Sequence, residues 1–264
     1  MLSLSITLIS ATLLMLSTTN SASAASLSIS PTSVALSAKK HSAALSLKND
    51  GDQTKIIQTE LLSWTQQDGE NVYTPNRDVL VNPPIATLQA GQTQIIRIGL
   101  NANVDKTQEL AYRLYITELA PPPSDDEQGL QLTLRLGLAV FVAPLGKVID
   151  KQAWKATRNA EGNLILSMSN IGNRHTLLTS LKVLDARSGE KLTEWQPKPA
   201  TLLAGQSRQI TLFMAPTWHG KTIRVVAGND EGVIESIIEI QSPIEIKAVI
   251  DNAQAISKTD QTKQ

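Results

Sequence analysis

Leucine occupies every second position, five times in succession, within the segment 129–144, GLQLTLRLGLAVFVAP. The five residues are Leu130, Leu132, Leu134, Leu136 and Leu138. Because successive side chains of a β-strand point to opposite faces, the pattern predicts a strand with one leucine face and one mixed face. The leucine face either lies in the protein's own core or is offered to another chain. Periodicity alone favours the internal strand.

Short runs rich in isoleucine, valine and leucine, many of them alternating, recur along the 264 residues. Turn sequences such as NDGD, QAGQ, NIGN and LAGQ separate them, and no long stretch keeps a helical period. Regularly spaced short strands are typical of β-sandwiches. The sequence therefore predicts an all-β fold, and the chain is long enough for two domains.

Two pairs of similar segments indicate that one plan occurs twice. LQAGQTQIIRI at 88–98 resembles LLAGQSRQITL at 202–212, and SLKNDGDQ at 46–53 resembles SMSNIGNR at 167–174. Both pairs keep their order, as two domains of the same general plan would. Chance likeness between turn-and-strand sequences is the alternative explanation.

The start of the chain has the composition of an export signal. Residues 1–24 contain no charged side chain, include the apolar run Leu8–Leu16, and end in Ala22-Ser23-Ala24. This small-x-small ending predicts a signal peptide cleaved before Ala25. No later segment approaches the ~20 uninterrupted apolar residues of a membrane span. We expect an exported, soluble mature protein.

Composition shifts and chain breakers suggest a division into parts. Pro144 and Gly146 interrupt the chain after the leucine strand, and the end of the chain is polar. The predicted parts are a signal peptide at 1–24, a first sandwich at 25–145 that contains the leucine strand at 129–143, a second sandwich at 146–246, and a disordered tail at 247–264.

Composition argues against several functional classes. The chain has no cysteine, which removes disulfides, thiol catalysis and cysteine-bound zinc. Its 24 Lys and Arg balance 24 Asp and Glu, so no global field attracts nucleic acid or an anionic membrane. His41, His175 and His219 are far apart, and no P-loop, G-x-S-x-G or G-x-G-x-x-G motif occurs. We expect a non-enzymatic protein with no cofactor, no metal site and no nucleic-acid partner.

Several blocks resemble those of the periplasmic chaperones that assemble pili in chaperone–usher systems. The blocks are SISPTSVALSA, LKNDG, VNPPIATLQAGQTQIIRI, YRLYITELAPPP and GLQLTLRLGLAVFVAP, followed by LSMSNIGNR and AGQSRQITLF. The ending R-x-G-x-x-V-F-V-x-P is similar to the archaic, or alternative, branch. The resemblance covers residues 26–243 and implies two immunoglobulin-like domains set at an angle, with a cleft between them.

The resemblance also implies a use for the leucine face. A pilus subunit lacks its final strand, and the chaperone would insert its own strand into the resulting groove, without ATP, before delivery to an outer-membrane usher. The donor residues would be Leu130, Leu132 and Leu134, with Leu136 as a further candidate. The first mature strand, Leu27–Leu36, would extend this surface. Pairing of two copies would protect the apolar edge from aggregation.

A second implied element, the anchor for the subunit's C-terminal carboxylate, departs from the family pattern. The first strand has no Arg or Lys before Lys39, and the position of the family's donor-strand lysine falls on Ala139. A buried carboxylate still requires a cation or several donors. The candidates are Arg97 and Arg135, with Arg113 third. Each of the three would otherwise form an ordinary surface or intradomain ion pair.

A different class of protein fits the same strand pattern. A two-domain immunoglobulin-like component of a cell surface or fibre would keep its leucine strand inside its own core. Such a protein would not co-purify with a pilus subunit, whereas a chaperone would.

Overall fold

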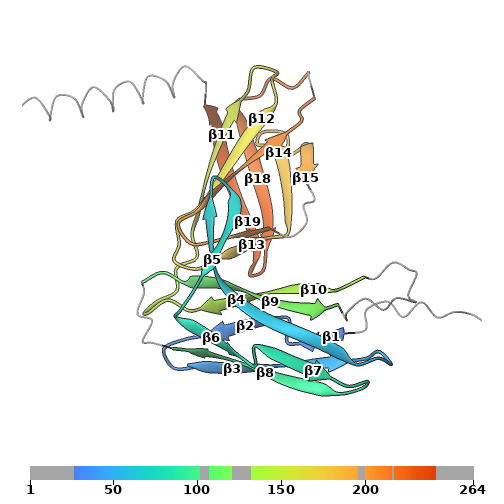
Figure 1. Ribbon diagram of the computed structural model, residues 1–264. Helices are drawn as coiled ribbons and strands as arrows, with labels where there is room; N and C mark the ends of the chain where they lie inside the picture. Colours follow the sequence, from blue (N-terminus) through green and yellow to red (C-terminus); the bar gives the residue numbers. More distant parts are fainter. Residues whose placement is uncertain (1–26, 102–106, 121–131, 196–199, 216, 242–264) are drawn as a thin grey trace, which may run out of the picture.

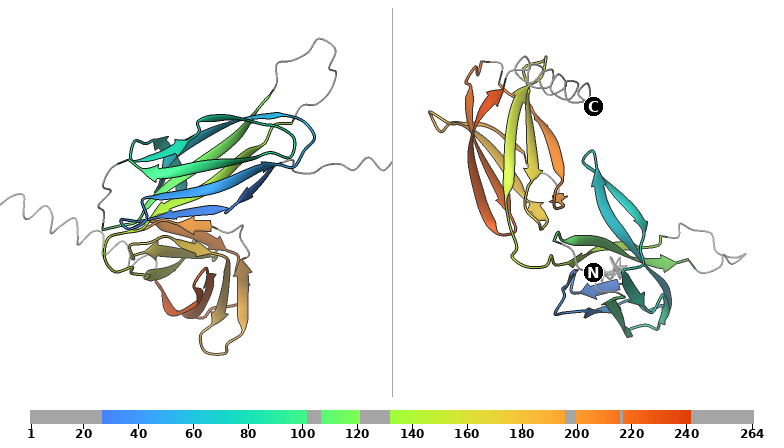
Figure 2. Two further views of the ribbon diagram at one scale, coloured as in Figure 1. Left: turned by 90° about the horizontal axis from the view of Figure 1, so that it is seen from below. Right: turned by 90° about the vertical axis from the view of Figure 1, so that its left-hand side faces the viewer.

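The computed structural model describes residues 27–101, 107–120, 132–195, 200–215 and 217–241. The predicted signal peptide, the predicted tail and Leu130 lie outside these ranges. Within them the chain forms nineteen strands and no helix, which confirms the all-β prediction. The strands form two groups that lie at an angle to one another (Figures 1 and 2). The break between the groups falls between Val142 and Gln152.

The first group is a sandwich of two sheets. Its strands are β1 (Leu27–Ser30), β2 (Ser33–Leu36), β3 (Ser42–Asn49), β4 (Lys55–Gln67), β5 (Glu70–Pro75), β6 (Val79–Asn82), β7 (Ile85–Leu88), β8 (Thr93–Leu100), β9 (Leu110–Leu119) and β10 (Arg135–Val142). One sheet has the order β1-β3-β8-β6, and the other has the order β2-β10-β9-β4-β5 with β7 on β4. Alternate residues such as Leu45, Ile96, Leu114 and Val140 point inward and are fully buried between the sheets.

The second group is built on a seven-stranded sheet with the order β15-β14-β18-β19-β11-β12-β17 and a small sheet of β13 and β16. Its strands are β11 (Gln152–Arg158), β12 (Leu164–Asn170), β13 (Thr176–Leu178), β14 (Ser180–Asp185), β15 (Lys191–Trp195), β16 (Ala200–Leu202), β17 (Ser207–Leu212), β18 (Thr222–Asn229) and β19 (Gly232–Gln241). Leu166, Val183, Ile223 and Val225 lie at the centre of its separate core.

A buried asparagine at the end of β3 fastens a turn in the first group. The Asn49 Nδ2 donates to the carbonyls of Gln53 at 2.7 Å and Leu88 at 3.1 Å. Its Oδ1 accepts from the Gly51 amide at 3.1 Å. Gly91, whose amide donates to the Asn49 carbonyl, has a φ of 73°, which favours glycine. One side chain thus joins two turns that are distant in sequence.

The second group contains the same arrangement at the end of β12. The Asn170 Nδ2 donates to the carbonyls of Arg174 at 2.7 Å and Leu202 at 3.1 Å, and its Oδ1 accepts from the Gly172 amide at 3.1 Å. Gly205 donates to the Asn170 carbonyl and has a φ of 74°. The segments that resemble one another in sequence therefore occupy equivalent places, which favours repetition of one plan over chance likeness.

Asn173 ties the connection between the groups to both of them. Its Nδ2 donates to the carbonyls of Thr107 at 3.3 Å and Lys147 at 3.0 Å. Its Oδ1 accepts from the Ile149 amide at 2.7 Å, and its carbonyl accepts from the Glu109 amide at 2.8 Å. One residue of the second group thus holds both the linker and the start of β9.

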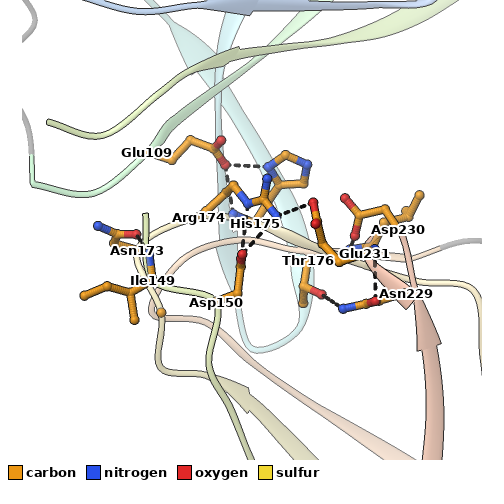
Figure 3. Close-up of polar contacts among 12 residues, drawn as sticks. Glu109, Ile149, Asp150, Asn173, Arg174, His175, Thr176, Asn229, Asp230 and Glu231 are labelled. Carbon is orange, nitrogen blue, oxygen red and sulfur yellow. Dashed lines mark hydrogen bonds and ion pairs between the residues drawn. The ribbon is translucent and has the colours of Figure 1, made fainter. Parts of the chain in front are cut away.

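A histidine–carboxylate hydrogen bond, drawn in Figure 3, and a ring stack reinforce this junction. The Glu109 carboxylate, with a side chain only 6% exposed, lies 2.5 Å from the Nδ1 of His175 and also accepts from the His175 amide. The His175 ring stacks on Phe141 of β10, with centroids 3.7 Å apart. Next to it, Arg174 bonds to Asp150 of the linker. The end of β10 is therefore fixed against the second group.

Candidate functional site

The two halves of β10 differ in their backbone pairing. β9 pairs with β10 along its whole length, whereas β2 pairs only with Ala139–Val142 on the other edge. Among the described residues, no strand pairs with that second edge from Arg135 to Leu138. Unpaired backbone groups at a sheet edge can accept an added strand from another chain.

The free edge arises from a break in the first strand of the chain. Leu27–Leu36 was expected to be one strand, and this expectation is wrong, because the chain divides at Pro31. Proline has no amide hydrogen for a ladder and restricts the backbone. β1 consequently pairs with β3 in one sheet, and β2 pairs with β10 in the other. β2 runs parallel to β10, so the residues that would cover the start of β10 are those before Ser33. β1, which lies in that part of the chain, belongs to the other sheet.

The predicted alternation of leucines is present, and burial along it is graded. Leu132 is 80% exposed, Leu134 and Leu136 pack half-buried against the rim of the core, and Leu138 is 5% exposed. The internal-strand interpretation therefore describes Leu138, whereas Leu132 lies outside the core and is exposed. β10 begins at Arg135 rather than at residue 129. The Leu134 carbonyl still accepts from the Glu118 amide of β9 at 2.8 Å.

The face of β10 opposite the leucines meets the second group at one end. Phe141 and Ala139 pack with Trp64 of β4 around Leu203, which belongs to the second group. Toward the start of β10 this face is open and carries Arg135. Ala139, where the family would place a lysine, is therefore part of the junction between the groups.

Two arginines lie on aromatic rings across this same face. The Arg113 guanidinium carbon lies 4.3 Å from the centroid of Trp64, and that of Arg135 lies 4.0 Å from the centroid of Tyr115. Both geometries are those of cation–π contacts. The Arg135 Nη2 is also 3.7 Å from the Glu60 carboxylate. Burial is the main cause that raises the pKa of the Tyr115 phenol, and the neighbouring Tyr73 adds to it.

Gly137 makes room for this packing. A Cβ at this position would lie 3.3 Å from Cε1 of Tyr115 and 3.5 Å from Cδ of Arg113. Both side chains therefore cross the strand where β10 has no side chain of its own. The spacing R-x-G at residues 135–137 was visible in the sequence. No sequence pattern around Trp64 indicated that its side chain would lie on this face.

The structure separates the two leading anchor candidates. Arg97 lies on the exposed outer face of β8, in the sheet that does not contain β10, between the buried residues Ile96 and Ile98. Arg135 and Arg113 share the outer face of the other sheet, where Arg113 pairs in register with Ala139. The structure therefore brings together Arg135 and the third candidate.

The part of the chain that the structure describes contains no group of three or more His, Cys, Asp or Glu side chains able to hold a metal ion. His175 is committed to Glu109, and the Nε2 of His41 lies 2.5 Å from the Ala38 carbonyl. No described helix is long and apolar enough to cross a membrane.

The fold and site define a class, that of two-domain immunoglobulin-like proteins with an unpaired, leucine-bearing strand edge. Solved structures with a similar fold are 15–20% identical to the chain. They include the CsuC–CsuE chaperone–tip adhesion subunit complex from the archaic Csu pili of Acinetobacter baumannii, with a TM-score of 0.59, 20% identity, and coverage of 83% of this chain and 99% of that one. The class 5 fimbriae chaperone CfaA has a TM-score of 0.58 and 15% identity. The match covers 81% of this chain and 100% of that one. The Salmonella enterica SafA pilin–SafB chaperone complex has a TM-score of 0.56 and 20% identity. The match covers 80% of this chain and 96% of that one.

Sequence comparison matches the first part of the chain to a family. Residues 26–147 match the model of the PapD N-terminal domain, described as a pili and flagellar-assembly chaperone. The first sandwich therefore resembles the N-terminal domain of pilus-assembly chaperones over residues 26–147. An uncharacterized fimbrial chaperone of Escherichia coli K12, YhcA, is 24% identical over 137 residues. That alignment spans 51% of this chain and 57% of YhcA, a little over half of each.

Proposed function

We propose that this protein is a periplasmic, ATP-independent chaperone that stabilises fimbrial subunits by donor-strand complementation and delivers them to an outer-membrane usher. The observation that carries the proposal is the division of β10, whose first half has a free edge beside exposed and half-buried leucines. An incomplete subunit would gain both a backbone partner and apolar side chains from this edge.

The energy of such a complex would come mainly from the leucines. Full burial of a leucine contributes about 1.5–3 kcal/mol before the cost of ordering. Leu132 is 80% exposed and would contribute most, because Leu134 and Leu136 are already half-buried against the first sandwich. Release would follow when the N-terminal extension of the next subunit packs the groove better. No nucleotide is needed for this exchange.

We also propose that Arg113 and Arg135 bind the C-terminal carboxylate of the subunit. Both lie on the open face beside the junction of the groups, and guanidinium groups are suited to paired hydrogen bonds with a carboxylate. The Arg135–Glu60 contact of 3.7 Å involves two exposed side chains, so exchange of this weak surface contact for a subunit carboxylate has a low cost.

The experiment is co-expression of the tagged protein with a fimbrial subunit, followed by purification from the periplasm. Leu132→Ser together with Leu134→Ser should greatly reduce the amount of subunit recovered while the chaperone stays folded. Ile85→Ser, at another exposed apolar position, is the matched control. Subunits that remain soluble and assembled with the double variant would contradict the proposal.

The anchor is tested in the same assay. Arg113→Ala and Arg135→Ala should each lower subunit recovery, and Arg97→Ala should not, because Arg97 projects from the opposite sheet. Loss of recovery with Arg97→Ala alone would reassign the anchor to that residue. Normal recovery with all three variants would reject these three arginines as the anchor.

A further inference from the structure

The hairpin formed by β4 and β5 projects from the first group toward the second (Figures 1 and 2). Gln66, near the end of β4, is 7% exposed and binds the second group with both ends of its amide. Its Nε2 donates to the Thr201 carbonyl at 2.9 Å, and its Oε1 accepts from the Leu203 amide at 3.0 Å. This is a two-point connection between segments that are more than 130 residues apart.

The same amide extends into the first group. The Gln66 Nε2 also donates to Oδ1 of Asn71 at 3.0 Å. This oxygen accepts a second bond, from the indole Nε1 of Trp64 at 2.9 Å. Asn71 pairs with Gln66, and Tyr73 pairs with Trp64, across the β4–β5 hairpin. The hydrogen-bond sequence therefore runs from Leu203 through Gln66 and Asn71 to the indole.

The indole of Trp64 is held on several sides. It is 3% exposed, packs in the cluster with Leu203, and lies 6.0 Å from Phe141 and 6.4 Å from Tyr73, measured between ring centroids. Arg113 rests on this ring. A planar guanidinium stacked on an aromatic face takes its orientation from that face.

We propose that Gln66 is a positioning residue that links docking of the second group to the orientation of Arg113, through Asn71 and Trp64. The functional meaning of this link rests on the proposed role of Arg113 in binding the subunit carboxylate. A purely structural role for Gln66 would stabilise the junction and leave the Arg113 guanidinium where it is.

Two variants separate these roles. Gln66→Met removes the amide and keeps a side chain of similar length, and it breaks the connection at the junction. Asn71→Ala leaves both bonds of Gln66 to the second group and removes only the acceptor shared with Trp64. Gln58→Met, on the same outer face of β4 and exposed, is the matched control.

The measurement is the NMR shift of the Arg113 side-chain Nε–H, assigned by its loss in Arg113→Lys. The ring current of Trp64 should displace this resonance, and Trp64→Leu should abolish the displacement. Gln66→Met and Asn71→Ala should each reduce the displacement, and Gln58→Met should not change it. Circular dichroism and thermal unfolding check that every variant is folded.

An Arg113 resonance unaltered in both folded variants, Gln66→Met and Asn71→Ala, would overturn the proposal. If Gln66→Met unfolds, Asn71→Ala alone decides, because it leaves the junction intact. Subunit recovery separates the proposed anchor role of Arg113 from the proposed positioning link. Normal recovery with Arg113→Ala would reject the anchor, whereas a reduced ring-current displacement of the Arg113 resonance in Asn71→Ala would still support the positioning link.

Discussion

Asn49 and Asn170 make the same two carbonyl bonds, at the same distances of 2.7 and 3.1 Å, in the two halves of the chain. Replacing either with alanine leaves these two carbonyls without their donor, and at Asn49 the Gln89 carbonyl loses its donor as well. We expect each variant to lose about 2–4 kcal/mol of unfolding free energy, confined to its own domain. Urea unfolding followed by tryptophan fluorescence and circular dichroism measures this loss.

The control for these variants is Asn101→Ala, which removes a single exposed bond to the Arg77 carbonyl. It should change the unfolding free energy by less than about 1 kcal/mol. A loss of the same size in Asn101→Ala would show that the buried positions of Asn49 and Asn170 are not special.

The graded burial along the leucine series predicts opposite effects at its two ends. Leu138→Ala removes a core side chain and should cost about 2–5 kcal/mol of stability. Leu132→Ala should leave stability within about 0.5 kcal/mol, because the side chain is 80% exposed. Chemical unfolding of the two variants tests this, and a large stability loss in Leu132→Ala would contradict the exposure of that residue.

Gly172 lies directly against the linker. A Cβ added there would be 2.1 Å from the Ile149 carbonyl oxygen, so Gly172→Ala must displace the linker backbone. We expect a loss of about 2 kcal/mol or more and faster tryptic cleavage at Lys147 or Lys151. Gly99→Ala, whose Cβ would meet only the His41 carbonyl at 3.7 Å, is the control and should behave like the parent protein.

Asp185 predicts a specific dependence on pH. Hydrogen bonds from the Ser188 amide, the Trp218 indole and the Arg187 amide lower the pKa of its carboxyl to about 2, from 3.8. A carboxyl with a depressed folded-state pKa stabilises the protein above its unfolded-state value, and the effect is lost as the pH falls through the folded value. The parent protein should therefore exceed Asp185→Asn in stability at pH 6, and the difference should shrink between pH 4 and pH 2.

Parallel urea titrations of the parent and Asp185→Asn at pH 6, 4 and 2 check this prediction. A difference that stays constant over this range would show that the carboxylate charge has no part in holding the turn.

Alternation and turn residues were sufficient to predict several features of the chain. The all-β fold, the repeated AGQ turns and the alternating leucines are all local in sequence, because strand periodicity and glycine conformation are properties of a few neighbouring residues. The position of Arg135 between Leu134 and Leu136 followed for the same reason.

The relation between distant segments could not be obtained in this way. Arg97 and Arg113 both alternate with buried apolar residues, and the sequence does not state which sheet each strand joins. The break at Pro31 and the end of pairing at Ala139 depend on the course of neighbouring strands. Likewise, the contact of Gln66 with Leu203 connects segments that share no local pattern.

The graded burial from Leu132 to Val142 has a consequence for which positions of this segment can change in sequence. Val140 and Val142 are buried in the core at one end, Leu134 and Leu136 pack half-buried against its rim, and Leu132 at the other end is exposed and contributes little to the fold of its own chain. Under the proposed function, a substitution at Leu132 could adapt the protein to another subunit at little cost to its own fold, whereas a substitution at Leu138, Val140 or Val142 would destabilise the first sandwich. One segment can in this way combine a fixed structural half with a half that tolerates change.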